Sequence, residues 1–138
     1  MTNGESRDQI IVAEDSAPNR KILAHLLKKL GYEVIPCENG EEAWAALDAD
    51  NGNRVVAVLS DVMMPLMDGL TLLKKIRNSE KSKAIPVVLI TAVSDQNLID
   101  EATALNVSGY ILKPITFAQV ESKISKLFPD KFSKKLTA

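Results

Sequence analysis

Five short apolar runs alternate along this 138-residue chain with stretches whose apolar residues recur at helical spacing, and this alternation limits the possible folds more than any other feature. The apolar runs are strand candidates at residues 9–13, 32–37, 55–60, 86–90 and 107–112. The helix candidates are residues 18–30, 41–50, 70–78, a segment that begins at the cap residue Ser94, and 116–128. Strands that alternate with helices pair in parallel through right-handed crossovers. The pattern therefore predicts an α/β fold in which helices cover both faces of a five-stranded sheet.

The apolar residues within these elements identify the faces that we expect to be buried. The strands lack the apolar–polar alternation of a sheet with one solvated face, which agrees with helices on both sides. In the first helix the apolar stripe consists of Ile22, Leu23, Leu26, Leu27 and Leu30. In the last helix it consists of Phe117, Val120, Ile124 and Leu127. We expect both stripes to pack against the sheet.

Composition excludes several classes of protein. Hydrophobic residues make up 46% and charged residues 25% of the chain, which is typical of a globular domain and not of a disordered one. The net charge is −1, whereas a dedicated nucleic-acid binder is usually strongly basic. The single Cys37 excludes a disulfide framework and a multi-cysteine zinc site. No apolar run approaches the roughly 20 residues of a membrane helix, and the N-terminus has no signal-peptide core, so we expect one cytoplasmic domain.

Polar side chains follow four of the five predicted strands, at the point where each strand ends. Glu14 and Asp15 follow the first strand, Asp61 the third, Thr91 the fourth and Lys113 the fifth. The carboxyl ends of parallel strands share one edge of the sheet, which is also where ligands bind in such folds. We therefore expect these side chains to meet, although they are far apart in the sequence.

Three carboxylates at one edge repel one another unless they take up protons or hold a cation. Two unit charges about 4 Å apart cost roughly 4 kcal/mol at an effective dielectric constant near 20. Oxygen ligands without histidine or cysteine suit a hard ion such as Mg²⁺. A divalent ion, a lysine and a hydroxyl around a carboxylate resemble the parts of a phosphoryl-transfer site in which one aspartate is the nucleophile.

Simpler alternatives exist for each of these residues. An aspartate after a strand is commonly a helix cap or a turn residue, and Asp15 lies just before a predicted helix. Lys113 could be a solvated loop lysine, and Thr91 a cap at the end of a strand. The coincidence of fitting groups at the ends of four strands favours the functional interpretation.

The motifs at these strand ends are similar to those of one protein family. Residues 60–69 read Ser-Asp-Val-Met-Met-Pro-Leu-Met-Asp-Gly, while Glu14-Asp15, Thr91-Ala92 and Lys113-Pro114 stand at other strand ends. Together they resemble the receiver domain of response regulators in two-component signalling. The resemblance implies a three-layer, doubly wound, flavodoxin-like (βα)5 fold with strand order 2-1-3-4-5. We expect a flexible segment at residues 1–8, the receiver domain at 9–128 and a polar tail at 129–138.

The resemblance also implies how the carboxylates act. Asp61 would accept a phosphoryl group from a phosphohistidine of a histidine kinase or a histidine phosphotransfer protein. Mg²⁺ would be held by Asp15, Asp61 and the backbone carbonyl of Met63, with Glu14 contributing through water. Such a domain accepts and loses its own phosphoryl group and is not a turnover enzyme in the ordinary sense.

Further implied roles concern the phosphoryl group and the signal. Lys113 would pair with the phosphoryl oxygens, Thr91 would donate a hydrogen bond to one of them, and the small Ala92 would leave room for the group. The Lys113–Pro114 peptide bond is expected to be cis, which proline makes accessible at about 0.5–1 kcal/mol. On phosphorylation Thr91 would move toward the phosphate and Tyr110 would turn inward, unless Tyr110 is an ordinary core aromatic.

The implied output is a changed surface formed by the fourth helix, the fifth strand and the fifth helix. A downstream effector protein would bind this surface in trans, without direct contact to nucleic acid or membrane. The same surface would allow a weak phosphorylation-dependent dimer of an otherwise monomeric protein. Two positions depart from some receivers, because Met63 and Val93 are apolar and cannot orient a water for attack on the phosphoryl group. We therefore hypothesise slow intrinsic dephosphorylation.

Other notable residues have ordinary interpretations. His25 is expected to be a solvated helix residue rather than a phosphorylatable histidine, Cys37 a small core residue and Trp44 a packing residue. A basic cluster is either a solvated face or a docking patch for an acidic partner. Its members are Lys74, Lys75, Arg77, Lys81 and Lys83.

Alternatives to a stand-alone switch remain open. The chain could be a receiver excised from a hybrid kinase or from a longer regulator, or a receiver-like module that binds partners without phosphorylation. A flavin-binding protein of similar topology would need a Ser/Thr/Gly-rich phosphate loop where Glu14 and Asp15 stand. An aspartate-nucleophile phosphatase would need a second aspartate at the position of Met63.

Overall fold

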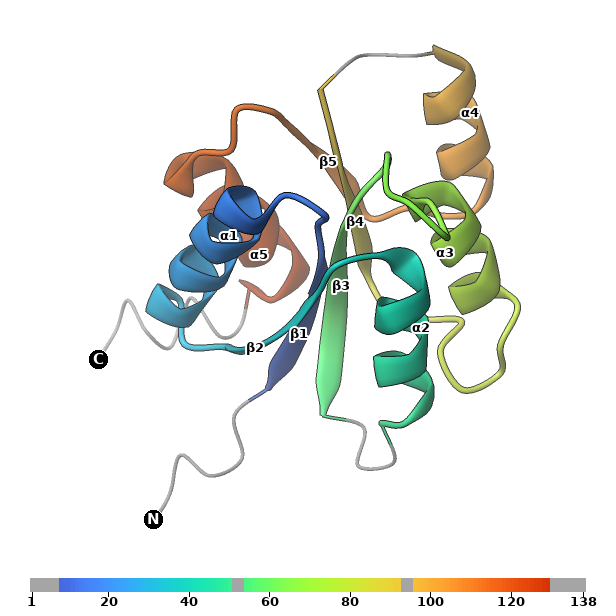
Figure 1. The fold of residues 1–138 in the computed structure, drawn as a ribbon, viewed down its shortest axis with the longest axis horizontal. Helices are drawn as coiled ribbons and strands as arrows, with labels where there is room; N and C mark the ends of the chain where they lie inside the picture. The colour runs from blue at the N-terminus through green and yellow to red at the C-terminus, as the bar shows by residue number, and fades with distance from the viewer. Residues whose placement is uncertain (1–7, 51–53, 93–95, 130–138) are drawn as a thin grey trace.

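The computed structural model describes residues 8–50, 54–92 and 96–129, which form a three-layer α/β fold (Figure 1). Five parallel strands run in the order β2-β1-β3-β4-β5. They are β1 (Gln9–Ala13), β2 (Glu33–Cys37), β3 (Val55–Asp61), β4 (Val87–Thr91) and β5 (Gly109–Leu112). The predicted fold class and strand order are both confirmed.

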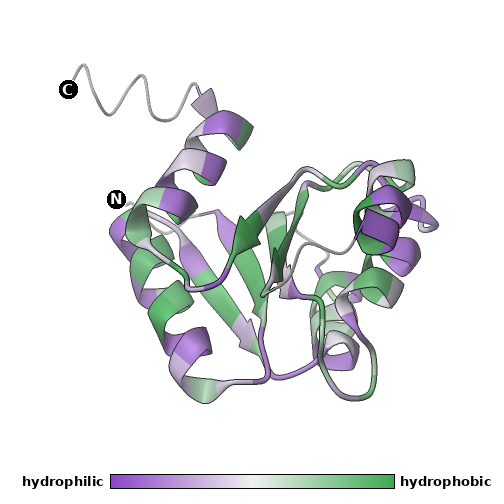
Figure 2. Ribbon diagram, turned by 90° about the horizontal axis from the view of Figure 1, so that it is seen from above, coloured by the Kyte–Doolittle hydropathy of each residue, from purple (hydrophilic) through white to green (hydrophobic). Residues whose placement is uncertain are grey.

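Helices cover both faces of the sheet, α1 and α5 on one side and α2, α3 and α4 on the other (Figure 1, Figure 2). They are α1 (Ala17–Lys29), α2 (Gly40–Asp48), α3 (Gly69–Arg77), α4 (Gln96–Ala104) and α5 (Phe117–Leu127). Among the residues that the structure describes, no helix has the length and apolar character needed to cross a membrane.

Side-chain caps fix where four of the helices begin. Ser16, Asn39, Asp68 and Thr116 each precede a helix and accept a hydrogen bond from the backbone N–H three residues later, at 3.4, 2.9, 2.8 and 3.2 Å. Ser94, the predicted cap of α4, lies outside the described residues. Each of these caps also ends the preceding loop, so the loops before α1, α2, α3 and α5 are held at their helical ends.

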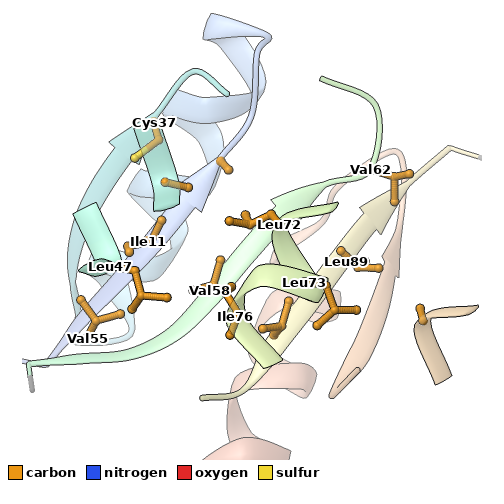
Figure 3. Packing of buried hydrophobic residues seen from close by; sticks show 14 residues of the cluster. Ile11, Cys37, Leu47, Val55, Val58, Val62, Leu72, Leu73, Ile76 and Leu89 are labelled. Atoms are coloured by element: carbon orange, nitrogen blue, oxygen red, sulfur yellow. The ribbon is translucent and has the colours of Figure 1, made fainter. Parts of the chain in front are cut away.

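The central strand β1 separates two apolar cores. Ile10 and Val12 face the core under α1 and α5, while Ile11 and Ala13 face the core under α2 and α3 (Figure 3). All four side chains are 0% exposed. Full burial of a Val or Ile side chain contributes about 1.5–3 kcal/mol, so this strand is a rigid support for the acidic pair that follows it.

Two residues of the predicted apolar stripes lie at the surface instead. Ile22 is 46% and Phe117 38% exposed. The buried line of α1 runs through Leu23 and Leu27, and Ile22 lies about 100° around the helix from Leu23, beyond the edge of the contact. In α5 the buried residues are Val120 and Ile124, one turn further along than Phe117.

Candidate functional site

Three carboxylates meet at the carboxyl edge of the sheet. The side-chain oxygens of Glu14, Asp15 and Asp61 lie within 4.8 Å of one another. The adjacent strands β1 and β3 bring them together, because their ends are in register at Ala13 and Ser60. Glu14 and Asp61 are buried, and Asp15 is exposed. The N-cap of α1 is Ser16, so the alternative role of Asp15 as that cap is wrong.

Lys113 reaches this cluster from the far side of β4. Its Nζ lies 2.8 Å from Oδ2 of Asp61 and 3.5 Å from Oε1 of Glu14. Its backbone N–H donates to the carbonyl of Thr91 at 2.9 Å, and the bond from Lys113 to Pro114 is cis. The side chain is 26% exposed and paired with two acids, so Lys113 is not the solvated loop lysine of the simpler alternative.

Glu14 is held at both its backbone and its side chain. Its N–H donates to Cys37 O at 3.0 Å, and its carbonyl accepts from Nη1 of Arg20 at 2.7 Å. Its Oε2 accepts from the N–H of Ser16 at 3.1 Å. The sequence pattern gave no sign of Arg20, because an arginine one turn into a helix is usually solvated. Its contact fixes the corner between β1 and α1, where two of the three carboxylates stand.

The pKa values in the cluster follow from burial and charge. Burial raises the pKa of Glu14 to about 7, and the neighbouring Asp61 carboxylate adds to the rise. The Ser16 N–H and the Lys113 charge act in the opposite direction but are outweighed. Burial lowers the pKa of Lys113, yet the hydrogen bond to Asp61 and the charges of both acids leave that pKa above its usual value. The site is therefore acidic, and its Glu14 carboxyl takes up a proton at a higher pH than an ordinary glutamate does.

The segment between β3 and α3, residues 62–68, is closed tightly over this edge. Gly69 donates its N–H to Val62 O at 2.9 Å, and Gly40 donates to Met67 O at 3.2 Å. A Cβ on Gly69 would overlap Asp61 O, and one on Gly40 would overlap Met67 O. Both glycines thus permit backbone approaches that no other residue allows. The two approaches fix residues 62–68 against the strand that carries Asp61 and against α2.

The remaining predicted site residues lie on β4, on β5 or in the segments that follow β3 and β4. Thr91 is buried at the end of β4, and Ala92 beside it is exposed. The Met63 side chain is 77% exposed. The Tyr110 hydroxyl donates to Ile99 O of α4 at 3.2 Å, so Tyr110 bridges β5 and α4. Val93 lies outside the described residues.

Residues with ordinary expected roles lie away from the cluster. His25 is exposed on α1. Cys37 is buried, and burial raises the pKa of its thiol to about 11, which makes it unreactive. Trp44 packs against the core under α2, with Lys75 Nζ 5.6 Å from its ring. Arg77 does not belong to an exposed basic patch, because its guanidinium donates to four backbone carbonyls.

Comparison with known proteins gives a family match over most of the chain. Residues 10–125 match the family model described as response regulator receiver domain. The chain belongs to this family. The receiver is 37% identical over 117 residues to the chemotaxis protein CheY1 of Helicobacter pylori, a match that covers 84% of this chain and 93% of the relative.

Solved structures of receivers share the same fold. The chemotaxis protein CheY4 of Vibrio cholerae superposes with a TM-score of 0.80 at 25% identity, covering 88% of this receiver and 99% of that chain. The receiver domain of a signal transduction histidine kinase from Syntrophus aciditrophicus superposes with a TM-score of 0.78 at 29% identity, covering 89% and 91%. The similar proteins thus include chemotaxis regulators and a domain of a kinase.

Proposed function

We propose that this receiver is a phosphoacceptor switch in which Asp61 takes a phosphoryl group from a phosphohistidine. A carboxylate oxygen of Asp61 would attack phosphorus, the P–N bond to the imidazole would break, and the imidazole would leave with the bonding electrons and take up a proton. The observation that carries the proposal is the buried Asp61 carboxylate with Lys113 Nζ at 2.8 Å and two further acids beside it. The donor is a histidine kinase or a histidine phosphotransfer protein.

The donor set fits Mg²⁺. Three carboxylates with oxygens within 4.8 Å, one of them exposed and none accompanied by histidine or cysteine, suit a hard divalent ion. Asp15, Asp61 and the backbone carbonyl of Met63 would hold it, with Glu14 contributing through water. When bound, Mg²⁺ supplies positive charge against the phosphoryl oxygens.

The chain's own groups complete the site. Lys113 carries a positive charge that its raised pKa maintains at neutral pH, and it would pair with a phosphoryl oxygen. Thr91, at the end of the adjacent strand β4, would donate its hydroxyl to another oxygen. Ala92 offers a methyl group where a larger side chain would fill the space, and the peptide bond from Lys113 to Pro114 is cis.

The output surface is proposed to be α4, β5 and α5. Tyr110 lies on β5, which pairs with the strand that ends in Thr91, and its hydroxyl donates to Ile99 O of α4 at 3.2 Å. It also lines a cavity of about 430 Å³ between β5 and α5, together with Leu112, Gln119 and Lys123. A movement of Thr91 and Tyr110 on phosphorylation would change this face, where an effector protein or a second copy would bind.

The phosphoryl group is proposed to be long-lived. Met63, 77% exposed beside the acceptor, cannot orient a water, and neither can Val93. The test compares the half-life of the phosphorylated wild type with that of the double variant Met63→Asn, Val93→Glu. An equally slow loss in the double variant would contradict the hypothesis.

One experiment tests the acceptor. The protein is incubated with Mg²⁺ and a small phosphodonor such as acetyl phosphate, and the phosphoadduct is followed by intact mass. We expect one adduct in the wild type and none in Asp61→Asn, while Asp68→Asn, which changes an exposed cap residue, retains it. Absence of an adduct in the wild type favours the module that binds partners without phosphorylation.

A further inference from the structure

Leu66 stands out among the residues that the structure describes, because its backbone and its side chain are both in unfavourable states. Its φ is 69°, in the left-handed region that side-chain-bearing residues rarely adopt. Its side chain is 75% exposed, more than every other large apolar residue described except Met63. Glycine or asparagine would meet the backbone requirement at lower cost, and a polar side chain would suit the exposure.

The surrounding backbone imposes this conformation on Leu66. The N–H of Met67 donates to Pro65 O at 2.7 Å, so Leu66 is the central residue of a three-residue turn. The turn is held from outside by the contact of Gly40 N–H with Met67 O at 3.2 Å. Leu66 is thus presented outward on a rigid turn. A turn whose backbone is already fixed loses little further backbone freedom when a partner covers it.

The position of the turn indicates which partner covers it. Residues 62–68 follow Asp61 directly and stand at the carboxyl edge of the sheet (Figure 1). The Asp61 side chain is only 6% exposed, so a protein that brings a phosphohistidine to it must also cover the residues around it. Met63 and Leu66 are the two most exposed large apolar side chains described, and both belong to this segment.

We propose that Leu66 is a docking residue for the protein phosphodonor, retained at a cost in stability. The inference rests on the proposed function and adds that the donor protein makes an apolar contact with the 65–67 turn. A small phosphodonor enters without this contact. The two routes of phosphorylation should therefore respond differently to substitution of Leu66.

Asn106 provides a matched control at the opposite edge of the sheet. It is the other described residue that is not glycine and has a positive φ, 57°, and it is exposed after α4. Leu66→Asn gives the turn a residue that tolerates this conformation, and Asn106→Leu does the reverse far from Asp61. Leu66→Met keeps an apolar side chain and the unfavourable φ.

The experiment measures melting temperature and both phosphorylation rates for these three variants. The protein donor is a phosphorylated histidine kinase or phosphotransfer domain from the same genome, selected because it transfers to the wild type. We expect Leu66→Asn to melt a few degrees higher, to transfer about tenfold more slowly from the protein donor, and to react normally with acetyl phosphate. Leu66→Met should transfer normally, and Asn106→Leu should melt lower with both rates unchanged.

Other results would overturn the inference. Equal slowing of both routes in Leu66→Asn would mean that the turn positions Asp61 and does not dock a donor. Unchanged transfer would remove the contact altogether, and loss of self-association instead of transfer would assign the turn to a second copy. If acetyl phosphate reacts but no phosphohistidine protein transfers to the wild type, the docking inference fails while the phosphoacceptor function stands. If acetyl phosphate does not react either, the proposed function fails first.

Discussion

The two edges of the parallel sheet solve opposite problems. At the carboxyl edge, Glu14 and Asp61 are buried acids that repel each other, and the chain turns through Leu66 at a positive φ. One lysine, Lys113, balances two of the three carboxylates. This edge carries charge repulsion and an unfavourable backbone, which a fold selected only for stability would avoid.

The amino edge has the reverse character. Arg77 donates to the carbonyls of Lys83, Ile85, Leu105 and Asn106 at 3.2, 2.7, 2.8 and 3.0 Å, joining the loop before β4 to the turn after α4. Buried Ser82 donates to Ile76 O at 3.0 Å, and Lys81 donates to Asp48 O. Polar groups here satisfy backbone carbonyls. The difference suggests that stabilising contacts are concentrated at the amino edge and the buried acids at the carboxyl edge.

The largest expected effect comes from removing the guanidinium at the amino edge. Arg77→Met leaves four carbonyls without their donor, and we expect a loss of about 2–4 kcal/mol in the free energy of unfolding. Urea unfolding measures this loss. Phosphorylation by acetyl phosphate should persist in the folded fraction, because Arg77 makes no contact with the acidic cluster.

Lys75→Met is the control for Arg77 on the same helix. Lys75 is exposed and contributes one contact, 5.6 Å from the Trp44 ring, so we expect a loss below about 1 kcal/mol. If Arg77→Met cost no more than Lys75→Met, the amino edge would not be the stabilising one.

The next expected effect is a gain in the free energy of unfolding, because the substitution removes a buried acid, Glu14, at the carboxyl edge. The pKa of Glu14 rises from 4.5 to about 7 on folding, so its stabilising contribution is complete below pH 4.5 and is lost as the pH rises through about 7. In metal-free solution, the wild type should therefore lose stability from pH 5 to pH 8 in a way that Glu14→Gln does not. The free energy of unfolding of Glu14→Gln relative to that of the wild type should rise over this range by on the order of 1–3 kcal/mol. Urea unfolding with a chelator at both pH values measures this gain. A parallel decline of both proteins with pH would contradict it.

The sequence predicted the arrangement at the carboxyl edge better than that at the amino edge. Glu14, Asp61, Thr91 and Lys113 could be placed together because strand ends follow from the alternation of apolar runs and parallel topology. The sequence groups Arg77 with exposed lysines, since a charged residue on a helix predicts solvation unless its tertiary partners are known. Those partners are carbonyls in loops, and backbone carbonyls leave no trace in a sequence.

Two further features could be found only in the three-dimensional structure, for similar reasons. The positive φ of Leu66 runs against the preference of leucine, and it goes together with backbone contacts of the turn that no sequence pattern reveals. Ile22 fits an apolar stripe by spacing, but the direction of the helix over the sheet decides which edge of the stripe is buried.

A smaller effect concerns metal binding at the carboxyl edge. If Mg²⁺ binds where Glu14 holds a proton near neutral pH, binding must release that proton. We expect the affinity for Mg²⁺ to rise about tenfold between pH 6 and pH 8, the range over which a group with a pKa near 7 deprotonates. Isothermal titration in two buffers of different ionisation enthalpy measures both the affinity and the proton release. Glu14→Gln should show weaker binding with little dependence on pH, and a pH-independent wild type would place the ion away from Glu14.

The smallest effect separates charge from hydrogen bonding at the amino edge. Lys83 forms an exposed ion pair with Glu80 at 3.1 Å, with side chains 57% and 91% exposed, while its own carbonyl accepts from Arg77. Because water and salt screen such a pair, Lys83→Met should change the free energy of unfolding by less than about 0.5 kcal/mol. Raising the salt concentration should leave the large effect of Arg77→Met almost unchanged, since that effect arises from donors facing carbonyls. A loss at Lys83 comparable to that at Arg77 would mean that surface charge, and not the satisfaction of backbone groups, makes this edge the stable one.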